Sequence, residues 1–354
     1  MDRIPFDEKE LIPIGYRKGV SPSSPRPIPI FNTPIAPKDN LMMLLNKEIP
    51  FWMPAGGESQ LLCPQCPDNI ARGLVFEAEK LDEADAGGPD MFGVEWEYDP
   101  VVKGSMVRPG EPIVKDLNHW EDYVTFPKVA DLMDWAAVSK RNKERYIKKE
   151  SAQVVTILTG FFERLISFVD FESAALALID EDQQDAVHRL FDRLATFYDE
   201  YIGYYKTYFD CDIINFHDDW GSQRAPFFSI STVREMILPY MKRVSDSIHS
   251  RGMKLDLHCC GKNEPLVPAM IEAGVDSWTG QPMNDFEWLY EQYGRQIVLG
   301  MPITGLRMDM SEKELWDTIE VFVKKHPYAK VRLRTVPDKT AEFLYEISRK
   351  VYCG

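Results

Sequence analysis

The stretch Met253-Lys-Leu-Asp-Leu-His258-Cys259-Cys260-Gly261 alternates apolar and polar residues and then ends in an imidazole, two thiols and a glycine. Alternation of this kind predicts a β-strand with ligand-type side chains at its C-terminal end. His258 and Cys260 are two residues apart, so on an extended chain they share one face and Cys259 points to the other. Zn²⁺ binds this pair of nitrogen and sulfur ligands. The structural alternative is a core histidine beside two small buried thiols.

Strand-like runs and helix-like runs alternate around this stretch. Apolar spacing predicts a helix over residues 180–209, and capping boxes at residues 232–235 and 311–314 predict two further helix starts. Strands are predicted at residues 154–158, 212–216, 253–258, 275–278, 296–299 and 330–334. Alternation of strands and helices predicts a parallel sheet with helices outside it.

Two more strands would complete a barrel of eight. Ile49-Pro-Phe-Trp-Met53 is the natural first strand, and the second is expected between residues 70 and 97. The predicted fold is therefore a single (β/α)8 TIM barrel over residues 46–354, preceded by an irregular, proline-rich N-terminal arm over residues 1–45. The alternative is an open, doubly wound sheet, but no GxGxxG follows any predicted strand, which disfavours its dinucleotide-binding form.

Composition excludes some classes of function. The chain has 354 residues, is 44% hydrophobic and carries a formal net charge of −15. Nucleic acids and anionic membranes attract clustered Lys and Arg, so neither is an expected partner. The N-terminal residues lack the apolar core of a signal peptide, and no membrane span is expected. Six cysteines in a chain of this length indicate a reducing, cytoplasmic setting, and the lone pair Cys63 and Cys66 is interpreted as part of a loop, with its role left open.

Polar side chains gather where the predicted strands end. Glu163 and Arg164 follow the strand at 154–158, and His217, Asp218 and Asp219 follow the strand at 212–216. In a (β/α)8 barrel the C-terminal ends of the strands lie on one face, and active sites are found on that face. The carboxylates are expected to bind a metal, orient a histidine or act in acid–base catalysis, the alternative being caps of the next turn. Glu163 and Arg164 are read as an internal ion pair or a substrate clamp.

Several motifs resemble the uroporphyrinogen decarboxylase superfamily over residues 45 to 350. They are Ile49-Pro-Phe-Trp-Met53, Asp90-Met-Phe-Gly-Val-Glu-Trp96, Phe209-Asp-Cys-Asp-Ile-Ile-Asn-Phe-His-Asp-Asp-Trp-Gly-Ser-Gln223, Ile237-Leu-Pro239, His258-Cys-Cys-Gly261, Ala273-Gly-Val-Asp276 and Gln292-Tyr-Gly294. The resemblance implies a (β/α)8 barrel, in agreement with the strand pattern.

The resemblance leaves two branches to compare. The decarboxylases carry an arginine-rich segment after the first strand, of the form Met-Arg-Gln-Ala-Gly-Arg, whereas this chain has Met53-Pro-Ala-Gly-Gly. Cofactor-free decarboxylation of a substrate with many carboxylates needs such arginine forks. The other branch contains methyltransferases that work with a corrinoid protein. There an HxC motif binds zinc, which implies His258 and Cys260 as ligands. A third ligand is expected to be a downstream cysteine, and the only one here is Cys353, with Asp219, Gln281 or a substrate atom as the alternatives.

The hypothesis that follows is methyl transfer between a small methylated compound and a corrinoid carried on a partner protein, with zinc as Lewis acid. An aromatic methyl ether is one substrate that the tryptophans would suit. The rival is a lyase on a carboxylated tetrapyrrole or smaller acid, and a third reading is a barrel that binds without turnover. The oligomeric state is left open, a homodimer included. Predicted roles are catalysis for His217, Asp219 and Glu163, and substrate binding for Trp52, Met53, Trp96, Trp220, Gln281 and Met301.

Overall fold

The computed structural model describes residues 2–17, 28–68, 86–100, 104–108, 110–333 and 336–354. The chain forms two compact units. Parallel strands alternate with helices in both of them, which confirms the predicted α/β class. Unit 1 comprises Met1–Gln60, Lys148–Ala152 and Ser277–Gly354, and unit 2 comprises Leu61–Ile147 and Gln153–Asp276.

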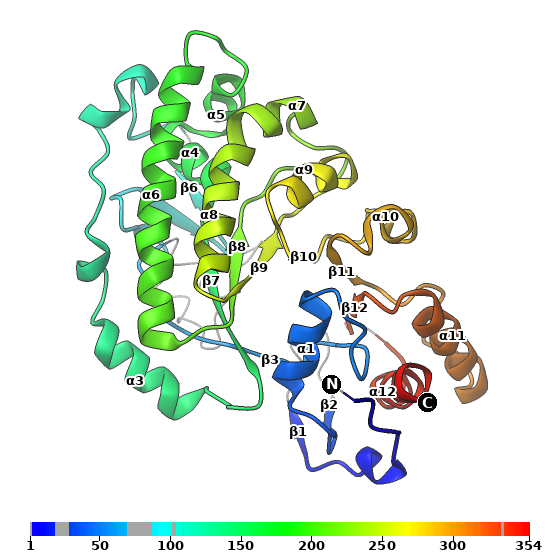
Figure 1. The fold of residues 1–354 in the computed structure, drawn as a ribbon. Helices are drawn as coiled ribbons and strands as arrows, with labels where there is room; N and C mark the ends of the chain where they lie inside the picture. The colour runs from blue at the N-terminus through cyan, green and yellow to red at the C-terminus, as the bar shows by residue number, and fades with distance from the viewer. Residues whose placement is uncertain (1, 18–27, 69–85, 101–103, 109, 334–335) are drawn as a thin grey trace. The chain divides into compact units, whose positions relative to one another are not determined.

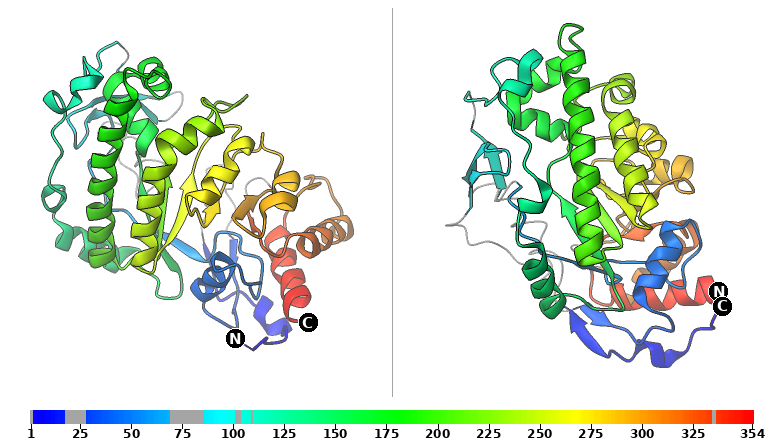
Figure 2. Two further views of the ribbon diagram at one scale, coloured as in Figure 1. Left: turned by 45° about the horizontal axis from the view of Figure 1, so that its top comes forward. Right: turned by 60° about the vertical axis from the view of Figure 1, so that its left-hand side comes forward.

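The centre of unit 2 is a run of parallel strands whose neighbours pair in register (Figure 1). Its strands are β7 (Ala152–Ile157), β8 (Ile213–His217) and β9 (Lys254–His258). Its helices include α4 (Phe161–Val169), α5 (Phe171–Ala177), α6 (Gln184–Phe209), α7 (Ile230–Thr232), α8 (Leu238–Ser250) and α9 (Val267–Glu272). Helices α6 and α8 lie side by side along these strands (Figures 1 and 2). The apolar faces predicted from sequence are buried there.

Unit 2 also contains α3 (Trp135–Arg145) and a small antiparallel sheet of β4 (Gly88–Pro89), β5 (Glu95–Asp99) and β6 (Gly104–Val107). The second barrel strand was expected between residues 70 and 97. Residues 69–85 lie outside the described part of the chain, and β5, at the end of that range, is antiparallel. The expected parallel strand is thus not found among the described residues of that range.

Unit 1 repeats the strand–helix alternation. It has the parallel strands β10 (Ser277–Trp278), β11 (Val298–Met301) and β12 (Lys330–Val331), and β3 (Ser59–Leu61) begins in it. Its other elements are α1 (Pro37–Leu45), β1 (Gly15–Arg17), β2 (Ile28–Ile30), α10 (Phe286–Tyr293), α11 (Glu312–Lys325) and α12 (Thr340–Cys353). The strand predicted over 330–334 is shorter than expected, and residue 334 lies outside the described residues.

The prediction of a first strand at Ile49–Met53 is wrong, because a side chain takes the place of a neighbouring strand. Asn40 on α1 accepts the N–H groups of Phe51 and Trp52 at 2.7 and 3.2 Å and donates to the Trp52 carbonyl at 3.0 Å. Pro50 has no N–H to give to a ladder. Asn40 therefore satisfies this backbone locally, and the segment runs as irregular chain.

Helix starts were predicted with mixed success. Ser311 caps α11 in a capping box with Glu314, as predicted. The box predicted at residues 232–235 is wrong: the helix begins at Ile230, where Ser229 accepts the Thr232 N–H. A π-helical turn, Val233–Ile237, then precedes Pro239. Serine and threonine in close succession offer competing caps, and the earlier one prevails here.

The N-terminal segment of unit 1 is fixed to its last helix by a buried ion pair. Glu10 accepts from Arg349 Nε and Nη2 at 2.7 and 2.8 Å and from the Tyr345 hydroxyl at 2.7 Å. Burial alone raises the pKa of Glu10, but the bonds from Arg349 and Tyr345 outweigh it and hold that pKa below its ordinary value. These residues belong to the folded core of unit 1.

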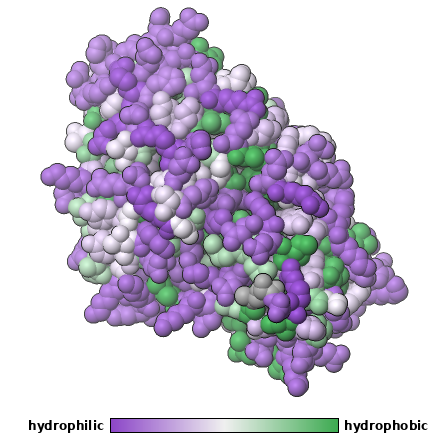
Figure 3. All heavy atoms as spheres, viewed as in Figure 1, coloured by the Kyte–Doolittle hydropathy of each residue, from purple (hydrophilic) through white to green (hydrophobic). Residues whose placement is uncertain are grey.

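Hydrophilic residues cover most of the face drawn in Figure 3. The large apolar side chains lie mainly inside the two units, and few of those described are exposed. Among the described residues, no helix combines the length and the apolar character that crossing a bilayer requires.

Candidate metal centre

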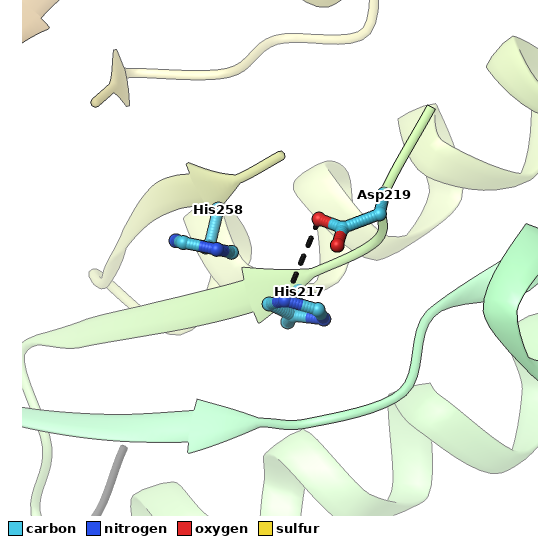
Figure 4. A group of neighbouring side chains, drawn as sticks. All are labelled: His217, Asp219 and His258. Carbon is cyan, nitrogen blue, oxygen red and sulfur yellow. Dashed lines mark ion pairs between the residues drawn. The ribbon is translucent and has the colours of Figure 1, made fainter. Parts of the chain in front are cut away.

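Two histidines close neighbouring strands and face each other. His217 is the last residue of β8 and His258 the last residue of β9, and the parallel register pairs them. Their rings stack with centroids 4.5 Å apart and an interplanar angle of 14° (Figure 4). The pairing follows from strand periodicity, because residues opposite each other in register point to the same face of the sheet.

Asp219 and Cys260 extend this pair from the loops that follow the two strands. Asp219 Oδ1 lies 3.5 Å from His217 Nε2 and accepts the Cys260 N–H at 2.7 Å. The Cys260 thiol lies 3.3 Å from His258 Nε2. One ligand atom from each of His217, Asp219 and His258 lies within 4.8 Å of the others (Figure 4). The structure therefore brings two predicted catalytic residues to the predicted metal ligand His258.

Glu163 approaches from α4 and completes a group of five, called the site cluster: Glu163, His217, Asp219, His258 and Cys260. The Oε2 atom of Glu163 lies 2.5 Å from His217 Nδ1, and the His217 side chain is 1% exposed. A carboxylate can only accept, so the ring donates its Nδ1–H and a neutral ring turns the Nε2 lone pair towards Asp219. Two acceptors then face each other over 3.5 Å. A cation bound between these two atoms, or a second proton on the His217 ring, removes the repulsion between the two acceptors.

Asp218, which sequence reasoning left between several roles, fixes the position of Glu163. Its buried carboxylate accepts the N–H groups of Phe162 and Glu163 at 3.2 and 2.9 Å, at the start of α4, and the Trp220 indole N–H at 2.8 Å. Burial, together with the nearby charge of Glu163, raises the pKa of Asp218 to about 7. Gly160 is required beside it, because a Cβ there would lie 2.6 Å from the Asp218 Cβ.

Cys259 points away from the site cluster, as the strand alternation predicts. Its buried sulfur accepts from the Trp220 N–H at 3.4 Å and the Asn263 amide at 3.1 Å. Burial raises the pKa of this thiol well above its ordinary value. Cys259 is thus a neutral packing residue.

Arg164 belongs to a buried ion cluster apart from the site cluster. Its Nη1 lies 2.5 Å from Asp90 Oδ2, and its Nη2 bonds Asp68. Burial raises the pKa of Asp68 to about 6 against the opposing effect of Arg164. Burial also acts against the charge of Arg164, but Asp90 and Asp68 outweigh it and raise the pKa of the guanidinium. The expected ion pair between Glu163 and Arg164 is not what forms: Arg164 pairs with Asp68 and Asp90, and Glu163 pairs with His217. A role of Arg164 as a substrate clamp stays untested.

The predicted substrate-binding tryptophans are buried, each with a fixed indole partner. Trp96 donates to Asp90 Oδ2 at 3.0 Å and Trp220 to Asp218, both in unit 2. Trp52, in unit 1, donates to Glu58 at 2.9 Å. These bonds fix the rings, and their contact with a substrate stays a prediction.

The remaining predicted residues lie in unit 1. Met53 donates its N–H to Ser348, and Met301 is buried at the end of β11. Gln281 follows β10, where its carbonyl accepts from Asn284. Cys353 is buried on α12 beside Phe51, with its sulfur 3.6 Å from the Phe51 carbonyl oxygen. Its role as third ligand stays a prediction.

The family of the chain can now be stated. The model of the family described as uroporphyrinogen decarboxylase (URO-D) matches residues 86–315. The chain belongs to this family. The match contains the whole site cluster, and it confirms the resemblance on which the sequence prediction relied. No curated protein matches the chain significantly in sequence.

Solved structures with a similar fold include a methyltransferase from Methanosarcina mazei. The TM-score is 0.62 at 14% sequence identity, over 90% of this chain and 99% of that chain. At this identity the likeness shows a shared fold. A D-psicose 3-epimerase matches with a TM-score of 0.35 and 11% identity, over 64% of this chain and 75% of that one, which is too low to support an argument.

Proposed function

We propose that this chain is a methyltransferase that moves a methyl group between a small methylated compound and a separate corrinoid protein, with zinc bound at the site cluster. The observation that carries the proposal is the close approach of His217 Nε2 to Asp219 Oδ1, at 3.5 Å, next to a thiol and a second imidazole. The shared fold with a methyltransferase over 90% of this chain supports the reaction class.

The donor set fits zinc by its chemistry, and two of its pairs have a suitable spacing. Zinc takes imidazole nitrogen, thiolate sulfur and carboxylate oxygen at about 2.0–2.3 Å, so tetrahedral neighbours lie roughly 3.3–3.8 Å apart. The distance from His258 Nε2 to Cys260 Sγ is 3.3 Å and that from His217 Nε2 to Asp219 Oδ1 is 3.5 Å. His258, Cys260, His217 and Asp219, all in unit 2, would hold the ion. A role for Cys353 as a ligand stays a proposal from the sequence resemblance alone.

The chain's own residues prepare this site. Glu163 keeps the Nδ1 proton of His217 in place and raises the basicity of its Nε2. Asp218 fixes the first turn of α4 and so the position of Glu163. The Cys260 N–H holds Asp219 Oδ1. When bound, zinc supplies Lewis acidity towards the heteroatom that gains or loses the methyl group.

The decarboxylase alternative requires cationic side chains that this chain does not have at the expected place. The segment Pro54-Ala-Gly-Gly57 has no Lys or Arg where a substrate with many carboxylates would need them. We further propose that the corrinoid arrives on a partner protein, that an aromatic methyl ether is a methyl donor, and that the thiol at the site requires the reducing cytoplasm.

Removal of metal is the direct test of this proposal. The purified protein is expected to contain about one zinc per chain by plasma mass spectrometry. Dialysis against a chelator should abolish demethylation of free methylcobalamin by added thiols, followed by its visible absorbance, and Zn²⁺ should restore it. A metal-free protein with full activity would contradict the zinc proposal. If the protein contains zinc but transfers no methyl group, and instead releases CO₂ from a carboxylated tetrapyrrole, the lyase alternative would be favoured.

Glu163→Gln is expected to weaken zinc binding by about 10- to 100-fold, because the amide cannot polarise His217 as a carboxylate does. Competition with a chromophoric chelator measures the change. Glu172→Gln, at an exposed position in the first turn of α5, is the matched control and should leave zinc affinity unchanged. Equal affinities for the parent and Glu163→Gln would show that Glu163 does not support a zinc ligand.

A further inference from the structure

The hydrogen bonding between β8 and β9 continues past the ends of the two strands and then changes its acceptor. The Asp218 N–H donates to the His258 carbonyl at 3.0 Å, which extends the parallel ladder by one step. In such a ladder every second residue donates to the neighbouring strand, so the next bond would join the Trp220 N–H to the Cys260 carbonyl. The Trp220 N–H donates instead to the Cys259 sulfur at 3.4 Å. A side-chain sulfur thus replaces a backbone acceptor where the two strands end.

The Cys260 carbonyl bonds to a side chain in place of the ladder. Asn263 Nδ2 lies 2.5 Å from this carbonyl oxygen and 3.1 Å from the Cys259 sulfur. The Lys262 N–H then donates to the Ser222 carbonyl at 2.8 Å, which joins the two loops again. Cys259 and Asn263 therefore replace one step of the ladder, and the pairing of the loops resumes beyond it.

Two glycines let these loops approach each other closely. A Cβ on Gly261 would lie 2.3 Å from the Gly221 carbonyl oxygen, and the φ of Gly261 is +97°, which side chains disfavour. A Cβ on Gly221 would lie 2.4 Å from Asn263 Oδ1. The Cys259 side chain is 1% exposed at this crossing. These contacts hold the two loops in one arrangement.

The residues next to the sulfur bond are members of the site cluster. Asp219 precedes Trp220 in the loop after β8, and His258 and Cys260 flank Cys259. The Cys260 N–H also donates to Asp219 Oδ1 at 2.7 Å. The bond from Trp220 to the sulfur therefore fixes the separation between the carboxylate on one loop and the imidazole and thiol on the other. Metal affinity depends on such separations, because residues behind the ligands set their positions.

We propose that Cys259 is a positioning residue of the site cluster: its sulfur accepts the Trp220 N–H and so holds Asp219 at the distance from His258 that a metal ion requires. This inference rests on the proposed function, since it concerns the spacing of the ligands of the zinc proposed there. It adds that the spacing depends on an acceptor atom at position 259, whereas the bulk of that side chain is not sufficient.

Three substitutions at position 259 separate the acceptor atom from packing. Cys259→Ala and the bulkier Cys259→Val both leave the Trp220 N–H buried without its acceptor, so zinc affinity should fall by about 10- to 100-fold in competition with a chromophoric chelator. Cys259→Ser keeps an acceptor and should recover most of that loss. Cys211→Ala is the matched control. It removes another buried thiol of unit 2, which donates to Met253 Sδ at 3.4 Å and precedes β8, so zinc affinity should not change.

Hydrogen exchange of the Trp220 amide, measured by NMR on the metal-free protein, gives a readout that needs no zinc. Exchange should be about tenfold faster or more in Cys259→Ala and Cys259→Val, and close to the parent rate in Cys259→Ser and Cys211→Ala. Circular dichroism identifies the variants that fold, and either of the first two is sufficient for the test.

The outcomes distinguish this inference from the zinc proposal. Parent-like exchange of the Trp220 amide in folded Cys259→Ala or Cys259→Val would overturn the role of Cys259, whether or not the protein binds zinc. Parent-like zinc affinity in either variant of a zinc-binding parent would overturn it as well. A parent that binds no zinc, but whose variants exchange as expected, would contradict the zinc proposal and support the role of Cys259 in holding the loops.

Discussion

Replacing His258 by alanine is expected to remove the proposed zinc and to slow the proposed methyl transfer by about a thousandfold. His258 stacks on His217 and lies 3.3 Å from the Cys260 thiol, so it connects the two halves of the donor set. Its loss leaves a carboxylate and one imidazole on one side and a lone thiol on the other. Lewis acidity is worth several kcal/mol in the transition state, and about 1.4 kcal/mol corresponds to a factor of ten.

The measurements are zinc per chain and the rate of methylcobalamin demethylation, for the parent and for each variant at equal folded concentration. His119→Ala is the control, because that imidazole is exposed and pairs with Asp116 away from the site cluster. Cys260→Ser should lose zinc as well, whereas Cys353→Ala decides whether the cysteine proposed from sequence is a ligand. Full zinc content and a normal rate in His258→Ala would rule out the zinc proposal.

Arg164→Met is expected to destabilise the protein by roughly 3–5 kcal/mol, the cost of removing one partner of a buried ion pair. Methionine keeps much of the side-chain volume but leaves Asp68 and Asp90 buried together without their cation. Arg189→Met is the control. Arg189 pairs with Glu121 at the surface, and such a pair contributes no more than about 1 kcal/mol. Urea unfolding followed by circular dichroism measures both changes.

The loss in Arg164→Met should shrink in acid. Without the arginine, the pKa of Asp68, already raised to about 6 by burial, rises further in the folded state. A carboxyl group with a raised folded pKa takes up protons on folding, so stability increases as pH falls from the folded pKa towards the unfolded value near 4. In the parent the folded pKa of Asp68 is about 6, so the variant should recover stability relative to the parent as pH falls from the variant's own higher folded pKa to about 6, and no further below that. A deficit that does not change with pH would show that lost packing, and not unpaired charge, causes the destabilisation.

Sequence periodicity was sufficient to predict a strand where the strand is buried and its residues follow a regular pattern. The strands that became β7, β8 and β9 were predicted within two residues, because their apolar runs are long enough to show a period. β3 was missed, since Ser59-Gln-Leu61 is too short to show one. Ile49–Met53 looked apolar enough for a strand, but nothing in its own sequence shows that Asn40 occupies its hydrogen bonds.

The same limit applies to the site. The spacing of His258 and Cys260 was visible on one strand, and the geometry places their side chains 3.3 Å apart. The pairing of His217 with Glu163 spans 54 residues, and the role of Asp218 at the start of α4 spans 55. Contacts over such separations depend on strand register and helix position, which one sequence without its fold does not supply. The charge pattern around Arg164 likewise gave no sign of Asp68 and Asp90 as its partners.

The bond between Glu10 and Arg349 has a consequence for the order in which the protein assembles on the ribosome. These residues are 339 positions apart, and unit 1 is built from both ends of the chain, whereas unit 2 ends at Asp276. Unit 2 can therefore fold while synthesis continues, but the opening segment must wait for α12 to emerge. Until then Phe6 and Leu11 lack Tyr345 and Cys353, two members of the core cluster against which they pack.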